Sequence, residues 1–157
     1  DRPYSGFKNF NTPSSIAQDL VDTGFNFVNG ANNHALDQGE QGVRNHIHTW
    51  NKFKYQVLFT GVYESEQAHR QIPIKTIKGV KVALLSYTFG TNDHQPTHDY
   101  TVDTFDENKI KQDVKKAKQQ SDVVLVSAHW GNEGKHQPNA TQKKYAQIFA
   151  DAGVDVV

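Results

Sequence analysis

Hydrophobic residues follow two patterns along the chain, a helical spacing of three to four residues and short continuous runs. The helical spacing predicts helices over residues 12–24, 40–54, 106–119 and 139–153. The runs predict strands over residues 25–29, 57–59, 72–77, 80–87 and 123–126, with another starting at residue 154. Because helices and strands alternate, the sequence predicts an α/β fold. Its sheet is expected to be mostly parallel, with an antiparallel hairpin around Lys78 and Gly79.

Polar residues mark the expected starts of the helices. Thr12 is expected to cap the first helix, with Pro13 at its first position, and Asp106 is expected to cap the third. The last helix is expected to start at Asn139 or Thr141. Residues 1–157 are expected to form a single, partial domain, because the chain starts without Met and ends on a strand pattern. We therefore expect a piece of a longer protein, truncated at both ends.

The chain is balanced in charge, with 17 Lys and Arg against 17 Asp and Glu. This balance indicates neither a nucleic-acid partner nor a polybasic membrane-binding surface. Hydrophobic residues make up 36% and aromatic residues 11% of the chain, which is enough for a core, so general disorder is not expected. The absence of cysteine excludes disulfides, thiolate metal ligands and a thiol nucleophile.

Two loops carry the residues best suited to chemistry, and each directly follows a predicted strand. Asn33 and His34 follow the strand at 25–29, and His129 follows the strand at 123–126. Ligand sites in open α/β sheets lie beyond the carboxyl ends of the strands, which is where these residues are expected. An amide oxygen or an imidazole can ligate a divalent cation, and an imidazole can also act as a general acid. The alternatives are an ordinary turn around Asn33 and a His129 that merely hydrogen-bonds a neighbouring backbone group.

Two acidic residues lie near these histidines in the sequence. Asp37, which follows His34 by three residues, is expected either to orient the imidazole ring or to cap the next helix. Glu133 follows His129 by four residues, a spacing that matters only in a helix, and this segment is expected to be a loop. Trp130 is expected to cover the end of the sheet.

The other histidines and most lysines of one helix are expected on the surface. The histidines are His46, His48, His69, His94, His98 and His136. The lysines that are expected to form a solvated helix face are Lys109, Lys111, Lys115, Lys116 and Lys118. The sequence has no nucleophile elbow, Walker loop or Rossmann glycine pattern.

Residues 23–28, 31–39, 121–133 and 151–157 together form a specific pattern. Its most distinctive parts are Ala-Asn-Asn-His-Ala-Leu-Asp and His-Trp-Gly-Asn-Glu. This pattern resembles the CapA family of capsule-synthesis proteins, also called the PgsA type of poly-γ-glutamate synthesis, which is similar to calcineurin-like metallophosphoesterases. The resemblance covers nearly the whole chain and implies a layered α/β sandwich of the metallophosphoesterase type, with a mixed sheet flanked by helices.

The resemblance also implies roles for the loop residues. Asn33 and His129 match metal ligands, and His34 matches the histidine that protonates the leaving group. Glu133 matches an acidic position of the family, and Gly134 stands where an aromatic residue is usual. Asp37 and Glu133 are therefore expected to support these ligands or to contact the substrate.

A divalent metal, Mn, Zn, Mg or Fe, is the implied cofactor of the intact domain. The family's first metal-binding Asp and its Gly-Asp block would lie before residue 1, and its Gly-His-x-His block would lie after residue 157. A site for two metal ions needs ligands from all these segments, so this chain alone is expected to bind metal weakly or not at all and to be inactive. The implied chemistry is hydrolysis of a phosphoester by a metal-activated water.

The implied partners are a phosphoester substrate or an anionic polymer, together with other capsule-synthesis membrane proteins. The implied location is the extracellular face of the cell membrane, held there by an anchor outside this chain. One alternative is a non-catalytic accessory or scaffold for the synthesis or export of an anionic polymer, because fold similarity does not establish chemistry. Another is an α/β domain without a site.

Overall fold

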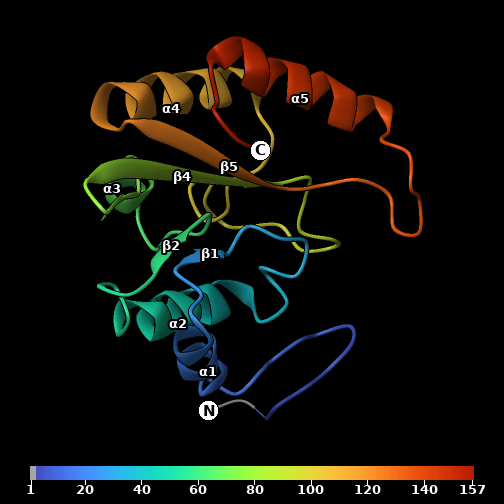
Figure 1. Ribbon diagram of the computed structural model, residues 1–157. Coiled ribbons are helices and arrows are strands. Elements are labelled where there is room, and N and C mark those ends of the chain that lie inside the picture. The colour runs from blue at the N-terminus through green and yellow to red at the C-terminus, as the bar shows by residue number, and fades with distance from the viewer. Residues whose placement is uncertain (1–2) are drawn as a thin grey trace.

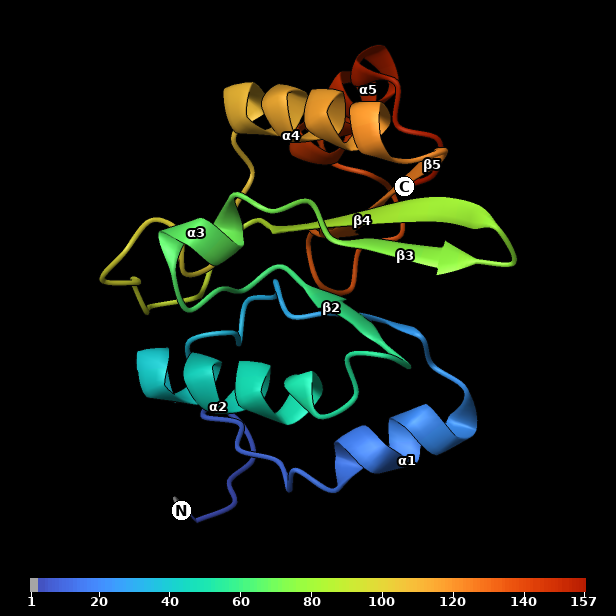
Figure 2. The ribbon, with the colours of Figure 1, turned by 90° about the vertical axis from the view of Figure 1, so that its left-hand side faces the viewer.

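The computed structural model describes residues 3–157 and arranges them in layers, with helices outside and strands inside (Figure 1). The elements are α1 (Ile16–Thr23), β1 (Phe27–Asn29), α2 (Gly39–Asn51), β2 (Leu58–Thr60), α3 (Glu66–His69), β3 (Ile74–Ile77), β4 (Val80–Thr88), α4 (Glu107–Gln120), β5 (Val123–His129) and α5 (Ala140–Ala152). In two views at right angles, α4 and α5 cover one outer side, and α1 and α2 cover the other (Figures 1 and 2).

The named strands form two sheets. β1 and β2 pair in parallel, while β4 pairs antiparallel with β3 and parallel with β5. The expected α/β sandwich with mixed strand directions is confirmed, although its strands divide between two sheets instead of lying in one. The physical reason lies in β4, where residues 82–88 are all buried. A strand buried on both faces needs a layer on each side, and the second sheet supplies one of them.

Successive side chains of β4 and β5 point to opposite faces of their sheet, so the hydrophobic core on the outer face is separate from the layer between the two sheets. On the outer face, Tyr87 of β4 stacks against Phe149 of α5 with ring centroids 6.1 Å apart, and both residues are fully buried. On the far side of the molecule, Trp50 of α2 stacks on Phe59 of β2 at 5.9 Å. The faces of the two sheets that remain between these cores carry the polar residues described below.

Local sequence signals account for several helix ends. The side chain of Asp106 accepts a hydrogen bond from the backbone N–H of Lys109, which confirms the predicted cap of α4. Asn139 caps α5 through a reciprocal pair of hydrogen bonds with Gln142, and Gly153 ends the same helix in the left-handed conformation at φ 88°.

The predicted start of the first helix is wrong. α1 begins at Ile16, after the cap position at Ser15, and not at Thr12 and Pro13. The backbone of Asn11 exchanges two hydrogen bonds with that of Ser5, so the chain just before Pro13 belongs to an N-terminal loop and cannot enter the helix. A cap signal in sequence does not reveal such a competing contact.

The structure also moves some strand boundaries and adds one short helix. β1 and β2 begin later than predicted, and β5 extends to His129, so this histidine ends the strand instead of following it. α3 was missed because its four residues are too few to show a helical stripe, although the Ser65 side chain caps it. The strand expected from residue 154 is present only as a bridge between Leu125 and Val156.

Within residues 3–157, no helix is long and apolar enough to cross a membrane. This finding concerns the described part of the chain alone.

Candidate functional site

Polar side chains collect between the two sheets at the carboxyl ends of the strands. Asn29 ends β1, Thr88 ends β4, and His129 ends β5 directly beside Thr88 in the strand register. Two residues earlier in the same pair of strands, Ser86 lies opposite Ser127. The Ser86 hydroxyl is buried and has no hydrogen-bond partner within the described residues, so this layer is polar and not fully satisfied.

Asn29 connects the two sheets beneath the site. Its side-chain amide donates to Ser127 Oγ at 2.9 Å, and its Oδ1 accepts from the backbone N–H of Ala31 at 2.7 Å. Gly61 approaches the same point so closely that a Cβ there would lie 2.7 Å from the Ala31 nitrogen. The loop that leaves β1 therefore has little freedom, and its side chains are aimed at the end of β5.

His34 is held by Asp37. The His34 Nδ1 lies 2.8 Å from Asp37 Oδ2, and the Asp37 side chain is only 3% exposed. The same carboxylate oxygen accepts the backbone N–H of Phe10 at 2.9 Å. Gln38, and not Asp37, occupies the cap position of α2. Of the two alternatives for Asp37, the geometry shows the contact with the His34 ring.

Asn33 and His129 meet across the gap between the sheets. The His129 Nε2 lies 2.9 Å from Asn33 Oδ1, and the Asn33 side-chain amide donates to Asn92 Oδ1 at 3.1 Å. Because the amide group of Asn33 faces Asn92, its oxygen is directed at the imidazole. Partial burial, and then the nearby charge of His34, hold the pKa of His129 below its usual value. A neutral imidazole is the form that can ligate a cation.

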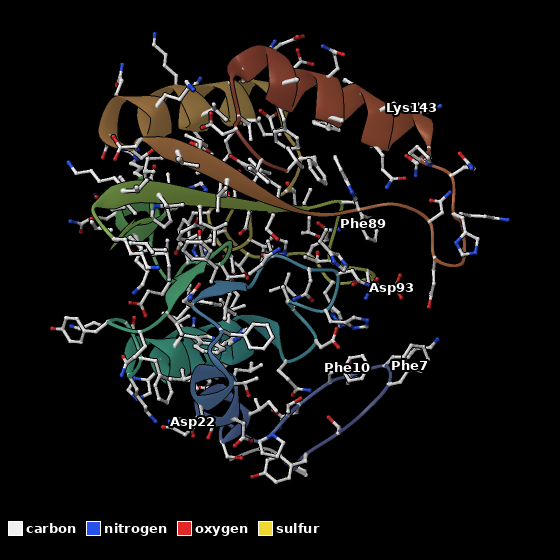
Figure 3. All side chains as sticks on the ribbon, in the orientation of Figure 1. Phe7, Phe10, Asp22, Phe89, Asp93 and Lys143 are labelled. Carbon is white, nitrogen blue, oxygen red and sulfur yellow. The ribbon has the colours of Figure 1, made fainter. Side chains whose placement is uncertain are left out.

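Exposed aromatic rings flank the two histidines. Phe10 meets the His34 ring edge to face at 4.7 Å, and Phe89 stacks on His129 at 6.0 Å with an interplanar angle of 17°. Figure 3 shows Phe89 above and Phe10 with Phe7 below, on the same side of the molecule. Phe7 continues the aromatic edge with its ring 6.3 Å from that of Phe10.

Glu133 does not join this cluster. It is exposed in the loop after β5 and lines a separate cavity of about 290 Å³ together with Trp130 and Lys135. Across residues 3–157, no hydrogen bond or ion pair joins Glu133 to Asn33, His34 or His129. Trp130 stacks on Phe105 at 5.7 Å, which fits its expected role as a cover of the sheet.

Sequence reasoning missed several residues of the site. Asn92, Phe10 and Phe89 have no motif, and each reaches its partner across a long stretch of chain. Only Phe89 could have been found from the sequence. It directly follows the strand β4 and therefore lies at the same sheet edge as His129. Asn92 has φ 53°, a conformation that asparagine tolerates better than most residues, but sequence alone does not show it.

His69 and Lys109 were wrongly expected to be solvated. His69 Nε2 lies 2.8 Å from Asp103 Oδ1, and Lys109 Nζ lies 3.1 Å from the same oxygen. Tyr63 donates to the other carboxylate oxygen at 2.9 Å. The Asp103 side chain is only 6% exposed, so it needs charged partners, and its place in the fold determines where His69 and Lys109 lie. Burial, and then the charge of Asp103, raise the pKa of Tyr63.

Comparison with known proteins identifies the family. A family profile described as "Bacterial capsule synthesis protein PGA_cap" matches residues 1–157. The chain belongs to this family. The expected relationship to CapA-type capsule proteins is thereby confirmed.

Two curated relatives agree with the family profile. "PGA biosynthesis protein CapA" of Bacillus subtilis (strain 168) is 31% identical over an alignment of 144 residues, and the match covers 88% of this chain and 37% of the relative. "Capsule biosynthesis protein CapA" of Bacillus anthracis is 28% identical over an alignment of 149 residues, and the match covers 88% of this chain and 34% of the relative. The chain thus spans little more than a third of the length of these relatives.

The donor atoms of this PGA_cap chain fit part of a metal site. Asn33 Oδ1 and His129 Nε2 converge from opposite sheets, and both atom types ligate divalent cations. No group of three or more His, Cys, Asp or Glu within the described range is arranged to hold a metal ion. The pair is suitable as two ligands of a larger set.

Proposed function

We propose that this chain supplies part of the active site of a divalent-metal-dependent phosphoesterase that acts in the synthesis of a poly-γ-glutamate capsule. The observation that carries the proposal is the contact of Asn33 Oδ1 with His129 Nε2 at 2.9 Å, with His34 beside them. Two possible metal ligands and a possible proton donor thus come from separate sheets to one edge. The family and the printed names of its relatives support the role in capsule synthesis.

His34 has the geometry of a general acid in this proposal. Asp37 occupies Nδ1 of the imidazole, which leaves Nε2 to give a proton to the departing oxygen of an ester. The buried Asp37 carboxylate also fixes the orientation of the ring through its contact with Nδ1. His34→Ala is expected to slow the release of a poor leaving group more than that of a good one.

Asn33 and His129 would hold the metal with ligands from parts of the protein outside this chain. A divalent cation bound there supplies the activation of a water molecule and the neutralisation of phosphoryl oxygens. Asn92 holds the Asn33 amide from behind and so keeps its oxygen directed inward. Phe10 packs against the ring of His34, and Phe89 packs against the ring of His129.

The first test is turnover of bis-p-nitrophenyl phosphate by the full-length protein with Mn²⁺. We expect His129→Ala, which removes a metal ligand, to lower turnover strongly. His34→Ala is expected to lower it less, because p-nitrophenolate is a good leaving group that gains little from a general acid. The control is His48→Ala, which changes an exposed histidine of α2. Absence of turnover with Mn²⁺, Zn²⁺, Mg²⁺ or Fe²⁺, or equal turnover by all variants, contradicts the proposal.

Calorimetric titration separates metal binding from catalysis. We expect Mn²⁺ to bind tightly to the full-length protein and weakly or not at all to residues 1–157 alone, because two ligands do not complete the site. Tight, stoichiometric binding by the short chain that is lost in His129→Ala would overturn this expectation.

The biological part of the proposal places the protein at the extracellular face of the membrane, beside other capsule-synthesis membrane proteins. We expect a strain carrying His34→Ala and His129→Ala to lose capsular poly-γ-glutamate. Full capsule production by that strain would contradict a catalytic role and leave a scaffold role in its place.

A further inference from the structure

We propose that Phe10 and Phe89 form the two walls of the substrate site and select an ester that carries a ring next to the reacting phosphoryl group. The inference rests on the proposed phosphoesterase function and adds to it the chemical class of the substrate. It starts from two exposed rings and the residues they contact.

Phe10 and Phe89 are exposed although they are large and apolar. Phe10 is 42% and Phe89 is 53% exposed, and neither belongs to the hydrophobic clusters of the described chain. Single exposed apolar residues are ordinary, so the position of these two rings beside the histidines matters more than their exposure. The core therefore does not explain why these rings are where they are.

Each ring is held against a different histidine of the candidate site. Phe10 contacts His34 at 4.7 Å, and its backbone N–H is fixed by the same Asp37 oxygen that orients His34. Phe89 stacks on His129 at 6.0 Å, and its backbone N–H donates to the carbonyl of His129 at 3.0 Å. The rings are thus positioned by the same contacts that position the histidines.

The two rings lie on opposite sides of the histidine cluster. Figure 3 shows Phe89 at the lower edge of the layer of β4 and β5 and Phe10 on the N-terminal loop below, with Asp93 labelled between them. A substrate group bound beside His34 would meet Phe10, and one bound beside His129 would meet Phe89. Aromatic faces prefer another ring, stacked or edge on, at 4.5–7 Å between centroids.

A diester offers the rings a group that a monoester lacks. Its second substituent stays on phosphorus when the ester is cleaved, so a ring at this position is the group that Phe10 and Phe89 would contact.

The test compares two diesters that share one leaving group. Phenyl p-nitrophenyl phosphate and methyl p-nitrophenyl phosphate both release p-nitrophenolate and differ only in the substituent that stays on phosphorus. With full-length protein and Mn²⁺, we expect a higher kcat/KM for the phenyl ester. Phe10→Leu and Phe89→Leu are expected each to lower this preference by about 2- to 10-fold, the scale of one aromatic pair.

Phe25→Leu is the matched control. Phe25 is 52% exposed, like Phe89, but it lies before β1, at the opposite end of the strand from the site. It is expected to leave the preference for the phenyl ester unchanged. Leucine keeps apolar bulk at each position, so a loss of preference reports the ring and not unfolding.

A binding measurement separates this inference from the proposed function. We expect phenylphosphonate to shift the NMR signals of the Phe10 and Phe89 rings at a lower concentration than methylphosphonate does. Ring-dependent binding without turnover supports the aromatic walls and contradicts the phosphoesterase function. Turnover with equal preference in all variants, or equal binding of the two phosphonates, overturns the inference while leaving the hydrolysis in place.

Discussion

The Asn29 side chain donates a hydrogen bond to Ser127 Oγ at 2.9 Å, although the two residues lie 98 positions apart in the sequence. The bond joins the two sheets. The same Asn29 side chain accepts the backbone N–H of Ala31, at the start of the loop that carries Asn33 and His34. The bond therefore connects the stability of the sandwich with the geometry of the site.

Replacing Asn29 or Ser127 is expected to destabilise the fold through this bond. Asn29→Ala leaves the Ala31 N–H unpaired in a partly buried position and should cost about 1–3 kcal/mol of unfolding free energy. Ser127→Ala should cost less, and a double-mutant cycle in urea should give a coupling of about 0.5–1.5 kcal/mol. The control is Asn45→Ala, which removes an exposed bond with Gln41 and should change the free energy by less than about 0.5 kcal/mol. Additive effects of the two core substitutions would show that the bond contributes nothing.

The buried carboxylate of Asp103 is expected to be among the most sensitive positions of the chain. Asp103→Ala leaves Lys109, His69 and the Tyr63 hydroxyl without their shared partner, so we expect a loss of about 3–5 kcal/mol in urea unfolding. Glu66→Gln, which breaks an exposed ion pair with Arg70, should cost less than about 1 kcal/mol. Comparable losses for the two variants would contradict the burial of the network.

The parts of the fold that sequence predicted are those with local causes. The caps at Asp106 and Asn139 bond within three residues of themselves, so a short window contains the whole signal. The placement of Asn33 and His129 at one edge followed from a general rule about strand ends. By contrast, His69 is held half-buried by Asp103, 34 residues away, and no local pattern distinguishes it from a surface histidine.

The division into two sheets and the positions of Phe10 and Phe89 could not be predicted from the sequence, for a related reason. Phe10 contacts His34 because the N-terminal loop folds back and donates its backbone N–H to Asp37. That fold-back depends on several weak contacts acting together, including those between Ser5 and Asn11. Patterns of hydrophobicity record which face of an element is buried, but they do not record which loop covers it.

The stability contribution of Glu40 is expected to depend on pH. Although partial burial raises it, hydrogen bonds from Thr97 and then from His98 hold the pKa of the Glu40 carboxyl below its ordinary value of 4.5. A lowered folded-state pKa means that ionised Glu40 stabilises the fold above about pH 4.5 and that this contribution disappears as the pH falls through the folded-state value. Arg44 Nη1 also lies 3.9 Å from Glu40 Oε2.

Urea unfolding of Glu40→Gln at two pH values tests this sign. The variant should be less stable than the wild type at pH 7, and the difference should shrink as the pH is lowered and the wild-type carboxyl gains a proton. Glu64→Gln, at an exposed position, serves as control and should show no such change. A difference that grows as the pH falls would mean that Glu40 is stabilised in its neutral form.

Asn92 is expected to position Asn33 without being needed for the fold. Its Oδ1 accepts the Asn33 amide at 3.1 Å, and its backbone has φ 53°. Asn92→Asp keeps an acceptor oxygen and a residue that tolerates this conformation, whereas Asn92→Gly keeps the conformation and removes the acceptor.

Relief of backbone strain in the glycine variant offsets the lost hydrogen bond, so unfolding free energies of both variants should stay within about 1 kcal/mol of the wild type. In NMR relaxation, the Asn33 side-chain amide should become mobile in Asn92→Gly and stay ordered in Asn92→Asp. With the full-length protein, Mn²⁺ should bind more weakly to Asn92→Gly and near normally to Asn92→Asp, because only the first leaves the Asn33 oxygen free to turn away from His129. An ordered Asn33 amide in Asn92→Gly would show that His129 alone is sufficient to orient it.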